Sequence, residues 1–200
     1  MKVKQILRYL RGTADLWLVG LVYKKNPRAP SICGFVDADF ASEIPSRKST
    51  SGFIIKVFSN TVMWGSRKQT MVALSTTESE FVATATAATE VLWFHKLLDD
   101  LHVAIPKPIV LYEDNHGAIF VSKNPETRRS KHYDIKFLFL QELTAAGIIE
   151  LSYVCSEDQE ADIMTKPLPA SHFSALMKLL ALQRGGVLNA TLMPASCTRA

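Results

Sequence analysis

The order of strand-like and helix-like segments is the feature of this 200-residue chain that most constrains its fold. Short apolar runs typical of strands occur at residues 31–40, 51–59, 61–69, 107–112 and 148–154. The second and third runs flank Ser59-Asn60 and predict a β-hairpin. Helical patterns are predicted at residues 3–11, 76–101, 116–123, 133–147, 156–166 and 170–182. This order predicts a mixed sheet with helical crossovers, which is an α/β fold.

Composition and charge set broad limits on the class of protein. The chain is 48% hydrophobic and 21% charged, which is typical of a soluble globular domain rather than a disordered chain. Its net charge of +4 is compatible with an anionic partner such as nucleic acid but does not require one. The three scattered cysteines, Cys33, Cys155 and Cys197, form neither a disulfide framework nor a zinc-binding spacing, so a reducing compartment is expected.

The chain divides into three parts by pattern. Residues 1–30 are predicted to be an N-terminal extension, with a basic amphipathic helix ended by Gly12 and a proline-containing connector at residues 24–30. Residues 31–182 are predicted to form the domain, and residues 183–200 an unstructured tail. Charged residues interrupt the apolar N-terminal stretch, so neither secretion nor a membrane span is expected.

Several carboxylates lie where predicted strands end or predicted helices begin. Catalysis on phosphodiesters commonly uses two hard divalent cations held by about four converging carboxylates. The first strand pattern places Asp37 and Asp39 on one face as it leaves the core. Asp37 could instead be an acid that initiates a turn, so this pair alone does not decide between the two interpretations.

Two glutamates, Glu78 and Glu80, lie near the start of the long predicted helix. Ser75 and Glu78 match the capping-box pattern, in which the Glu78 side chain reaches back to the Ser75 N–H. Glu78 therefore has a sufficient structural role, whereas Glu80 has no such explanation. We favour Glu80 as the candidate ligand.

Asp114 and Asp162 are further candidates with plausible local alternatives. Asp114 ends an apolar strand and could be a helix N-cap, although Asn115 could serve instead. Residues 156–159 match a second capping box, which would place Asp162 in the second turn of a short helix, where it could simply be solvated. The four acids together are stronger evidence for a metal site than any one of them.

Five sequence blocks stand out along the chain: "GFVDADFAS…RKSTSGF", "VALSTTESEFVA", "LYEDNHGAI", "SKHYDIK" and "SEDQEADIMTKPLP". With these blocks, the chain resembles the ribonuclease H domain of copia-type retrotransposon Pol polyproteins over about Ile32 to Leu182. The N-terminal "VKQILRYLRGT" resembles the end of the reverse transcriptase connection, while the Y-x-D-D polymerase motif is absent, so we expect a fragment without polymerase activity.

The resemblance implies an RNase H fold with a five-stranded mixed sheet flanked by helices. It also implies cleavage of the RNA strand of RNA–DNA hybrids with two Mg²⁺ ions, for which Mn²⁺ can substitute. Carried over by motif, the metal ligands are Asp37, Glu80, Asp114 and Asp162, with Asp37 bridging both ions. The loop at residues 154–161 lacks the histidine found in many cellular relatives, so slower turnover is expected.

The resemblance further implies partners and a location. These are an RNA–DNA hybrid, the reverse transcriptase domain of the same polyprotein, and cytoplasmic retroelement particles or the nucleus, with no membrane. Basic residues near the expected site are candidate phosphate contacts. They are Arg47, Lys48, Arg67, Lys68, Arg128, Arg129, Lys131 and His132.

Two alternatives to the nuclease remain open. One is an inactive or co-opted module that keeps the fold and binds nucleic acid without cleaving it. The other is a different Mg²⁺-dependent phosphotransferase. The second alternative requires a nucleotide pocket, and the sequence has no glycine-rich phosphate loop.

Overall fold

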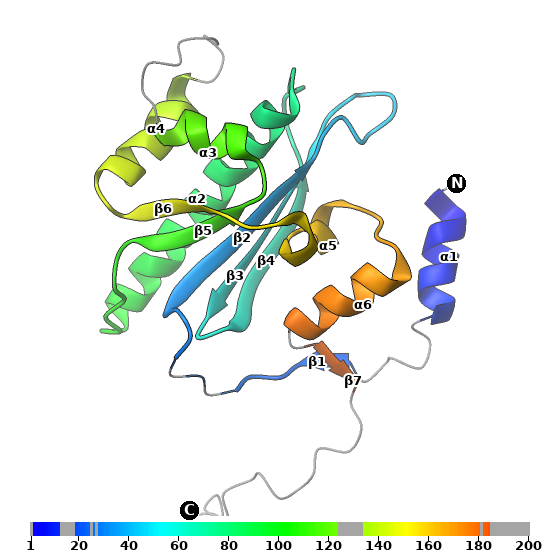
Figure 1. Cartoon of the computed structure of the whole chain (residues 1–200), viewed down its shortest axis with the longest axis horizontal. Helices are drawn as coiled ribbons and strands as arrows, with labels where there is room; N and C mark the ends of the chain where they lie inside the picture. Colours follow the sequence, from blue (N-terminus) through cyan, green and yellow to red (C-terminus); the bar gives the residue numbers. More distant parts are fainter. Residues whose placement is uncertain are drawn as a thin grey trace, which may run out of the picture.

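The computed structural model of the chain describes residues 2–12, 19–24, 26, 28–123, 134–180 and 182–184. Figure 1 shows a central sheet with helices packed around it. The helices are α1 (Lys2–Gly12), α2 (Thr76–Asp100), α3 (His116–Lys123), α4 (Asp134–Ala145), α5 (Asp162–Thr165) and α6 (Ala170–Leu179). The strands are β1 (Val19–Leu21), β2 (Ile32–Asp39), β3 (Thr50–Val57), β4 (Asn60–Lys68), β5 (Ile109–Glu113), β6 (Ile149–Tyr153) and β7 (Leu182–Arg184).

The main sheet has five strands in the order β4-β3-β2-β5-β6. Strand β3 pairs antiparallel with both β2 and β4, whereas β5 pairs parallel with β2 and β6. The predicted hairpin is β3–β4, and the crossover from it to β5 runs through α2. The predicted five-stranded mixed sheet flanked by helices is therefore confirmed.

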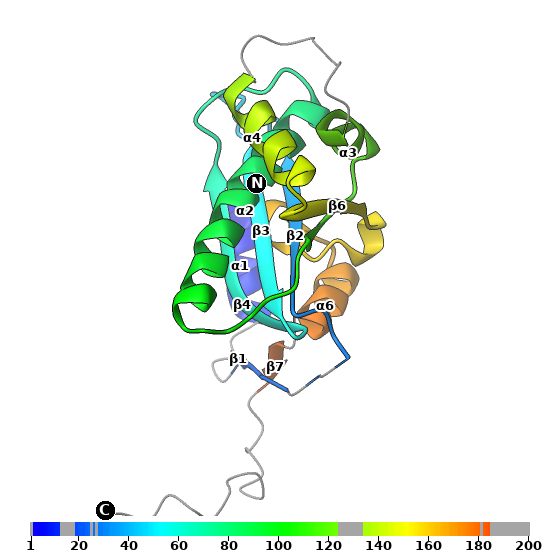
Figure 2. The same cartoon turned by 90° about the vertical axis from the view of Figure 1, so that its left-hand side faces the viewer.

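The two faces of the sheet are covered by different helices. Helices α2 and α4 pack on one face, where the main hydrophobic core includes Val36, Phe53, Ile55, Val91 and Leu140. Helices α5 and α6 lie on the opposite face, so that α2 and α6 stand on either side of the sheet (Figure 2). The side chains of a strand alternate between these faces. Val36 points toward α2 and α4, so Cys33, Phe35 and Asp37 point toward the opposite face.

The approach of α5 to the sheet depends on a glycine in β3. A Cβ atom at Gly52 would lie 2.6 Å from the Thr165 side chain and 2.9 Å from Met164 Cβ. Gly52 is also the register partner of Asp37 across the β2–β3 pair. The absence of a side chain at Gly52 therefore lets α5 lie against the sheet beside Asp37.

Two boundaries differ from the sequence prediction. Strand β7 pairs antiparallel with β1, so the predicted boundary at residue 182 falls inside a strand. This pairing also joins the N-terminal extension to the end of the predicted domain. The second capping box forms only a 3-10 turn (Ser156–Asp158), and α5 begins at Asp162 itself. Asp162 is therefore in the first turn of α5 rather than the second turn of a longer helix.

Helix length and polarity bear on membrane insertion. Among the helices of the described residues, none combines the length and the apolar character that crossing a bilayer would require.

Candidate active site

Asp37 lies near the end of β2 and is fully buried. Its two carboxylate oxygens have different partners: Lys166 Nζ donates to Oδ1 at 2.8 Å, and the Thr165 hydroxyl donates to Oδ2. Both partners belong to α5 or its C-terminal cap, so α5 fixes the orientation of Asp37. The alternative that Asp37 is a solvated turn residue does not hold.

The two glutamates at the start of α2 have separate roles. Ser75 caps the helix by accepting a hydrogen bond from the Glu78 N–H at 3.1 Å, as the capping-box pattern predicts. The Glu78 carboxylate accepts from the Leu74 N–H instead of the Ser75 N–H. Glu80, two residues after Glu78 in α2, is the glutamate that lies beside Asp37.

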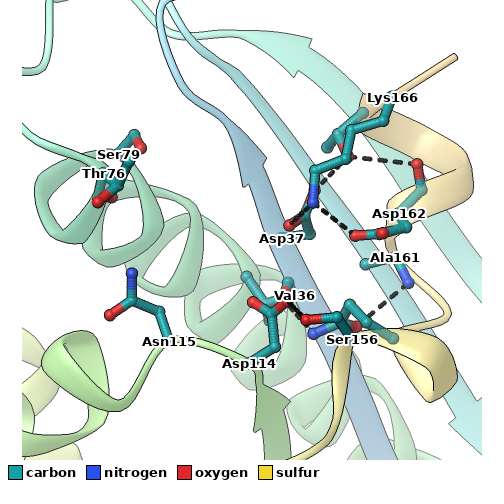
Figure 3. A network of polar contacts seen from close by, with 12 residues as sticks. Val36, Asp37, Thr76, Ser79, Asp114, Asn115, Ser156, Ala161, Asp162 and Lys166 are labelled. Carbon is teal, nitrogen blue, oxygen red and sulfur yellow. Dashed lines mark hydrogen bonds and ion pairs between the residues drawn. The ribbon is translucent and has the colours of Figure 1, made fainter.

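Asp114 follows β5 directly, and its role as an N-cap is excluded by its neighbour. Asn115 Oδ1 accepts a hydrogen bond from the Ala118 N–H at 3.1 Å and thereby caps α3. Asp114 instead accepts from the Ser156 hydroxyl at 2.8 Å, from the 3-10 turn after β6 (Figure 3). Capping of α3 by Asn115 leaves the Asp114 carboxylate available for the site.

Three of the four predicted acids converge. One oxygen from each of Asp37, Glu80 and Asp114 lies within 4.8 Å of the other two. Glu80 Oε2 is buried and has no hydrogen-bond partner. Burial raises the pKa of Glu80 far above its ordinary value, and the neighbouring carboxylates of Glu113, Asp37 and Asp114 raise it further. The ammonium group of Lys166 acts in the opposite direction and lowers the pKa of Glu80.

Asp162 joins the site through a lysine. Lys166 Nζ donates to Asp162 Oδ1 at 2.8 Å, the same distance that joins it to Asp37. In Figure 3 the side chains of Asp37, Asp162 and Lys166 point toward one another. Burial raises the pKa of Asp162 to about 6, although the hydrogen bond from Lys166 opposes this shift.

The segment before Asp162 is anchored by buried polar groups. The Gln159 side chain donates to the Val36 carbonyl at 2.9 Å. Lys56 Nζ on β3 donates to both carboxylate oxygens of Glu160, at 2.7 and 2.8 Å, and to the Leu179 carbonyl at 3.0 Å. These contacts tie the residues just before α5 to the sheet and to α6.

Two of the four predicted acids line an open cleft of about 590 Å³. Glu80, Asp114 and Lys166 lie on its wall, and Asp39 lines it as well. The remaining lining residues come mainly from the ends of β2 and the starts of α2 and α3: Ala38, Phe40, Thr76, Asn115, His116 and Gly117. The site is therefore open to a ligand larger than a single ion.

Two of the predicted basic pairs lie at the same end of the sheet as the acids. Strand register aligns Asp39 of β2 with Thr50 of β3, and Thr50 with Lys68 of β4. Arg67 forms an ion pair with Glu90 at 3.1 Å, and Lys68 one with Glu43. Arg47 and Lys48 lie in the β2–β3 connection at this end. The other four predicted contacts, Arg128, Arg129, Lys131 and His132, lie outside the described residues.

Several residues of the site were not predicted individually from the sequence. Lys166 is four residues after Asp162, the spacing at which side chains on a helix meet. This spacing alone could have predicted the ion pair from the sequence. Glu113 is fully buried next to Asp114, and its carboxylate accepts hydrogen bonds from the Thr84 hydroxyl and the Asn115 N–H. Burial raises the pKa of Glu113 to about 8.

The chain is similar to segments of retrotransposon polyproteins. It is 33% identical over 183 residues to the Retrovirus-related Pol polyprotein from transposon RE1 of Arabidopsis thaliana, covering 91% of this chain and 12% of that protein. It is also 33% identical over 182 residues to the corresponding polyprotein from transposon TNT 1-94 of Nicotiana tabacum, covering 90% of this chain and 13% of that protein. The chain thus spans only about an eighth of the length of these relatives. No model of a protein family matches it.

Solved structures with a similar fold are ribonucleases H. LC11-RNase H1, solved in complex with an RNA/DNA hybrid, matches this chain with a TM-score of 0.52 at 12% identity. The match covers 67% of this chain and 93% of the LC11-RNase H1 chain. The N-terminal RNase H domain of rv2228c from Mycobacterium tuberculosis matches with a TM-score of 0.52 at 8% identity. This match covers 74% of this chain and 96% of the other chain. At these identities the likeness concerns the fold. The chain is therefore a homologue of a segment of the Pol polyproteins of copia-type retrotransposons, and it has the ribonuclease H fold.

Proposed function

We propose that the chain is a Mg²⁺-dependent endoribonuclease that cleaves the RNA strand of RNA–DNA hybrids during retroelement reverse transcription. The observation that carries this proposal is the convergence of Asp37, Glu80 and Asp114, of which Glu80 and Asp114 line an open cleft. Asp162 is joined to Asp37 through Lys166. The ribonuclease H fold and the polyprotein relatives support the same activity.

The donor set fits a hard divalent cation. Mg²⁺ prefers carboxylate oxygens, and the three converging acids offer one each within 4.8 Å. The buried Glu80 Oε2, which has no hydrogen-bond partner, is an acceptor that a cation would satisfy. A bound cation would supply the positive charge that polarises a phosphodiester and lowers the pKa of bound water.

The residues of the site have distinct proposed roles. Asp37, Glu80 and Asp114 would hold one cation, and Asp37 with Asp162 would hold a second. Ser156 orients the Asp114 carboxylate through its hydroxyl, and Thr165 orients Asp37. Asn115, as the cap of α3, fixes the start of the helix next to Asp114.

The hybrid is proposed to lie across the open end of the sheet. Arg47, Lys48, Arg67 and Lys68 at this end would contact phosphates, which sets affinity and salt dependence rather than sequence choice. Recognition of the hybrid would rest on its shape and on RNA 2′-hydroxyls. The proposed partner within the polyprotein is the reverse transcriptase domain, and the proposed setting is the retroelement particle.

The test is cleavage of a labelled RNA strand in an RNA–DNA hybrid with Mg²⁺. The proposal predicts cleavage of the RNA strand that leaves single-stranded RNA and duplex DNA intact. Asp37→Asn and Asp114→Asn should each abolish cleavage. Tight binding of the hybrid without cleavage, at high protein concentration and low salt, would instead favour a module that binds nucleic acid without cutting it.

A further inference from the structure

Lys166 occupies a central position between two of the proposed metal ligands. It is the C-cap residue of α5, and its Nζ bridges Asp37 Oδ1 and Asp162 Oδ1 at 2.8 Å each. Asp37 is fully buried and Asp162 nearly so. Two buried carboxylates facing one another require a compensating positive charge, and the ammonium of Lys166 provides it.

The site is therefore charged unevenly. The side formed by Asp37 and Asp162 carries the positive charge of Lys166. On the other side, Glu80 Oε2 is buried without a hydrogen-bond partner. Among the described residues, neither Glu80 nor Asp114 forms an ion pair, whereas the position between Asp37 and Asp162 already holds an ammonium group.

We propose that Lys166 is the resident counter-cation of the Asp37–Asp162 pair and that a divalent cation binds between these carboxylates only by displacing its ammonium group. This inference rests on the proposed function, because it concerns the second of the two cation positions. It makes the two positions unequal. Lys166 contacts only Asp37 of the three ligands proposed for the first position, whereas it contacts both ligands of the second, which fills only after Lys166 has moved.

The structure gives Lys166 a route out of the site. Its side chain is 33% exposed, whereas the Asp37 side chain is fully buried and the Asp162 side chain 7% exposed. Lys166 also lies on the wall of the open cleft. A lysine ammonium is strongly hydrated and sits on a flexible four-carbon stem, so it can move into solvent without rearrangement of the backbone.

The experiment measures Mn²⁺ binding by isothermal titration calorimetry and, separately, the melting temperature in excess EDTA. The variants are Lys166→Met, Asp37→Asn and the matched control Lys178→Met, which removes an exposed lysine of α6. Lys166→Met should lower the melting temperature in EDTA, because the two aspartates lose their counter-charge. It should also tighten the weaker Mn²⁺ site about tenfold, because no ammonium competes for it. Lys178→Met should change neither quantity.

Opposite changes in stability and metal affinity distinguish this role from a merely structural one. If Lys166→Met is unfolded in EDTA, Lys166→Gln removes the charge while keeping a hydrogen-bond donor, and it should show the same tightening. Lys166→Arg keeps the charge and should bind Mn²⁺ as the wild type does.

The outcomes separate this inference from the proposed function. Unchanged or weaker Mn²⁺ binding in both neutral variants, with binding lost in Asp37→Asn, would overturn the role of Lys166 and keep the metal site. Mn²⁺ binding that Asp37→Asn leaves intact would overturn the metal site itself and the role of Lys166 with it.

Discussion

The buried ion pair of Lys56 and Glu160 offers a quantitative test of how the segment before Asp162 is held. Both side chains are buried, and Lys56 Nζ donates to the two Glu160 oxygens and to the Leu179 carbonyl. Burial raises the pKa of Glu160, and the contact with Lys56 opposes that shift. Lys56 therefore supplies the positive charge that compensates the Glu160 carboxylate in the core.

Replacing Lys56 by methionine keeps the length of the side chain but leaves the Glu160 carboxylate and the Leu179 carbonyl without their partner. Removing one member of a buried pair typically costs about 3–5 kcal/mol. We expect Lys56→Met to lower the free energy of unfolding at neutral pH by this amount. The cost should shrink at acidic pH, where protonation of Glu160 removes the uncompensated charge.

Chemical denaturation followed by circular dichroism measures these changes. The exposed lysine control, Lys96→Met, should alter the free energy of unfolding by no more than about 0.5 kcal/mol. The double variant Lys56→Met/Glu160→Leu should recover most of the loss, because an apolar pair of similar volume can replace a buried ion pair. A loss below about 1 kcal/mol in Lys56→Met, or a double variant as unstable as the single one, would refute this reasoning.

Three further predictions concern the elements around the site. Gly52→Ala should destabilise the protein by about 1–3 kcal/mol through overpacking against Thr165 and Met164, and Mn²⁺ binding should weaken with it; unchanged thermal and metal-binding curves would contradict the close approach of α5. Asn115→Ala should cost about 1 kcal/mol in chemical denaturation through loss of the α3 cap, and a neutral effect would count against that cap. In the metal-free protein, the raised pKa of Asp162 means that the folded state holds a proton that the unfolded state has released, so the free energy of unfolding should fall as the pH rises from about 4 to about 6. In EDTA, the free energy of unfolding of Asp162→Asn should fall less over this range than that of the wild type. Parallel pH curves for the two proteins would exclude Asp162 as the source.

Much of the fold follows from local sequence patterns. The strand alternation around Asp37, the β3–β4 hairpin and the Ser75 cap of α2 all appear in the structure as predicted. Each depends on neighbouring residues, whose periodicity and capping chemistry can be read directly. The short β1–β7 pair was missed because it joins two segments far apart in the chain, neither of which has a distinctive pattern.

The candidate site was predictable only in part, for a similar reason. The choice of Glu80 over Glu78 followed from the capping box, and the structure places Glu80 beside Asp37 and Asp114. The sequence left Asp114 open between a cap of α3 and a site residue, with Asn115 as an alternative cap, because only the folded chain shows that Ser156 engages Asp114. The Lys56–Glu160 pair spans 104 residues and had no local signature.

The proposed function requires the four acids to form a metal site that cleaves the RNA strand of RNA–DNA hybrids. The most direct measurement compares Mg²⁺-dependent cleavage of a labelled hybrid by the wild type, Asp114→Asn and Glu78→Gln. Glu78 is the matched control because it lies two residues from Glu80 on the same helix, while its carboxylate accepts a hydrogen bond from the Leu74 N–H. We predict cleavage by the wild type and by Glu78→Gln, and none by Asp114→Asn. Cleavage that persists in Asp114→Asn would contradict the site, as would loss of cleavage in a folded Glu78→Gln.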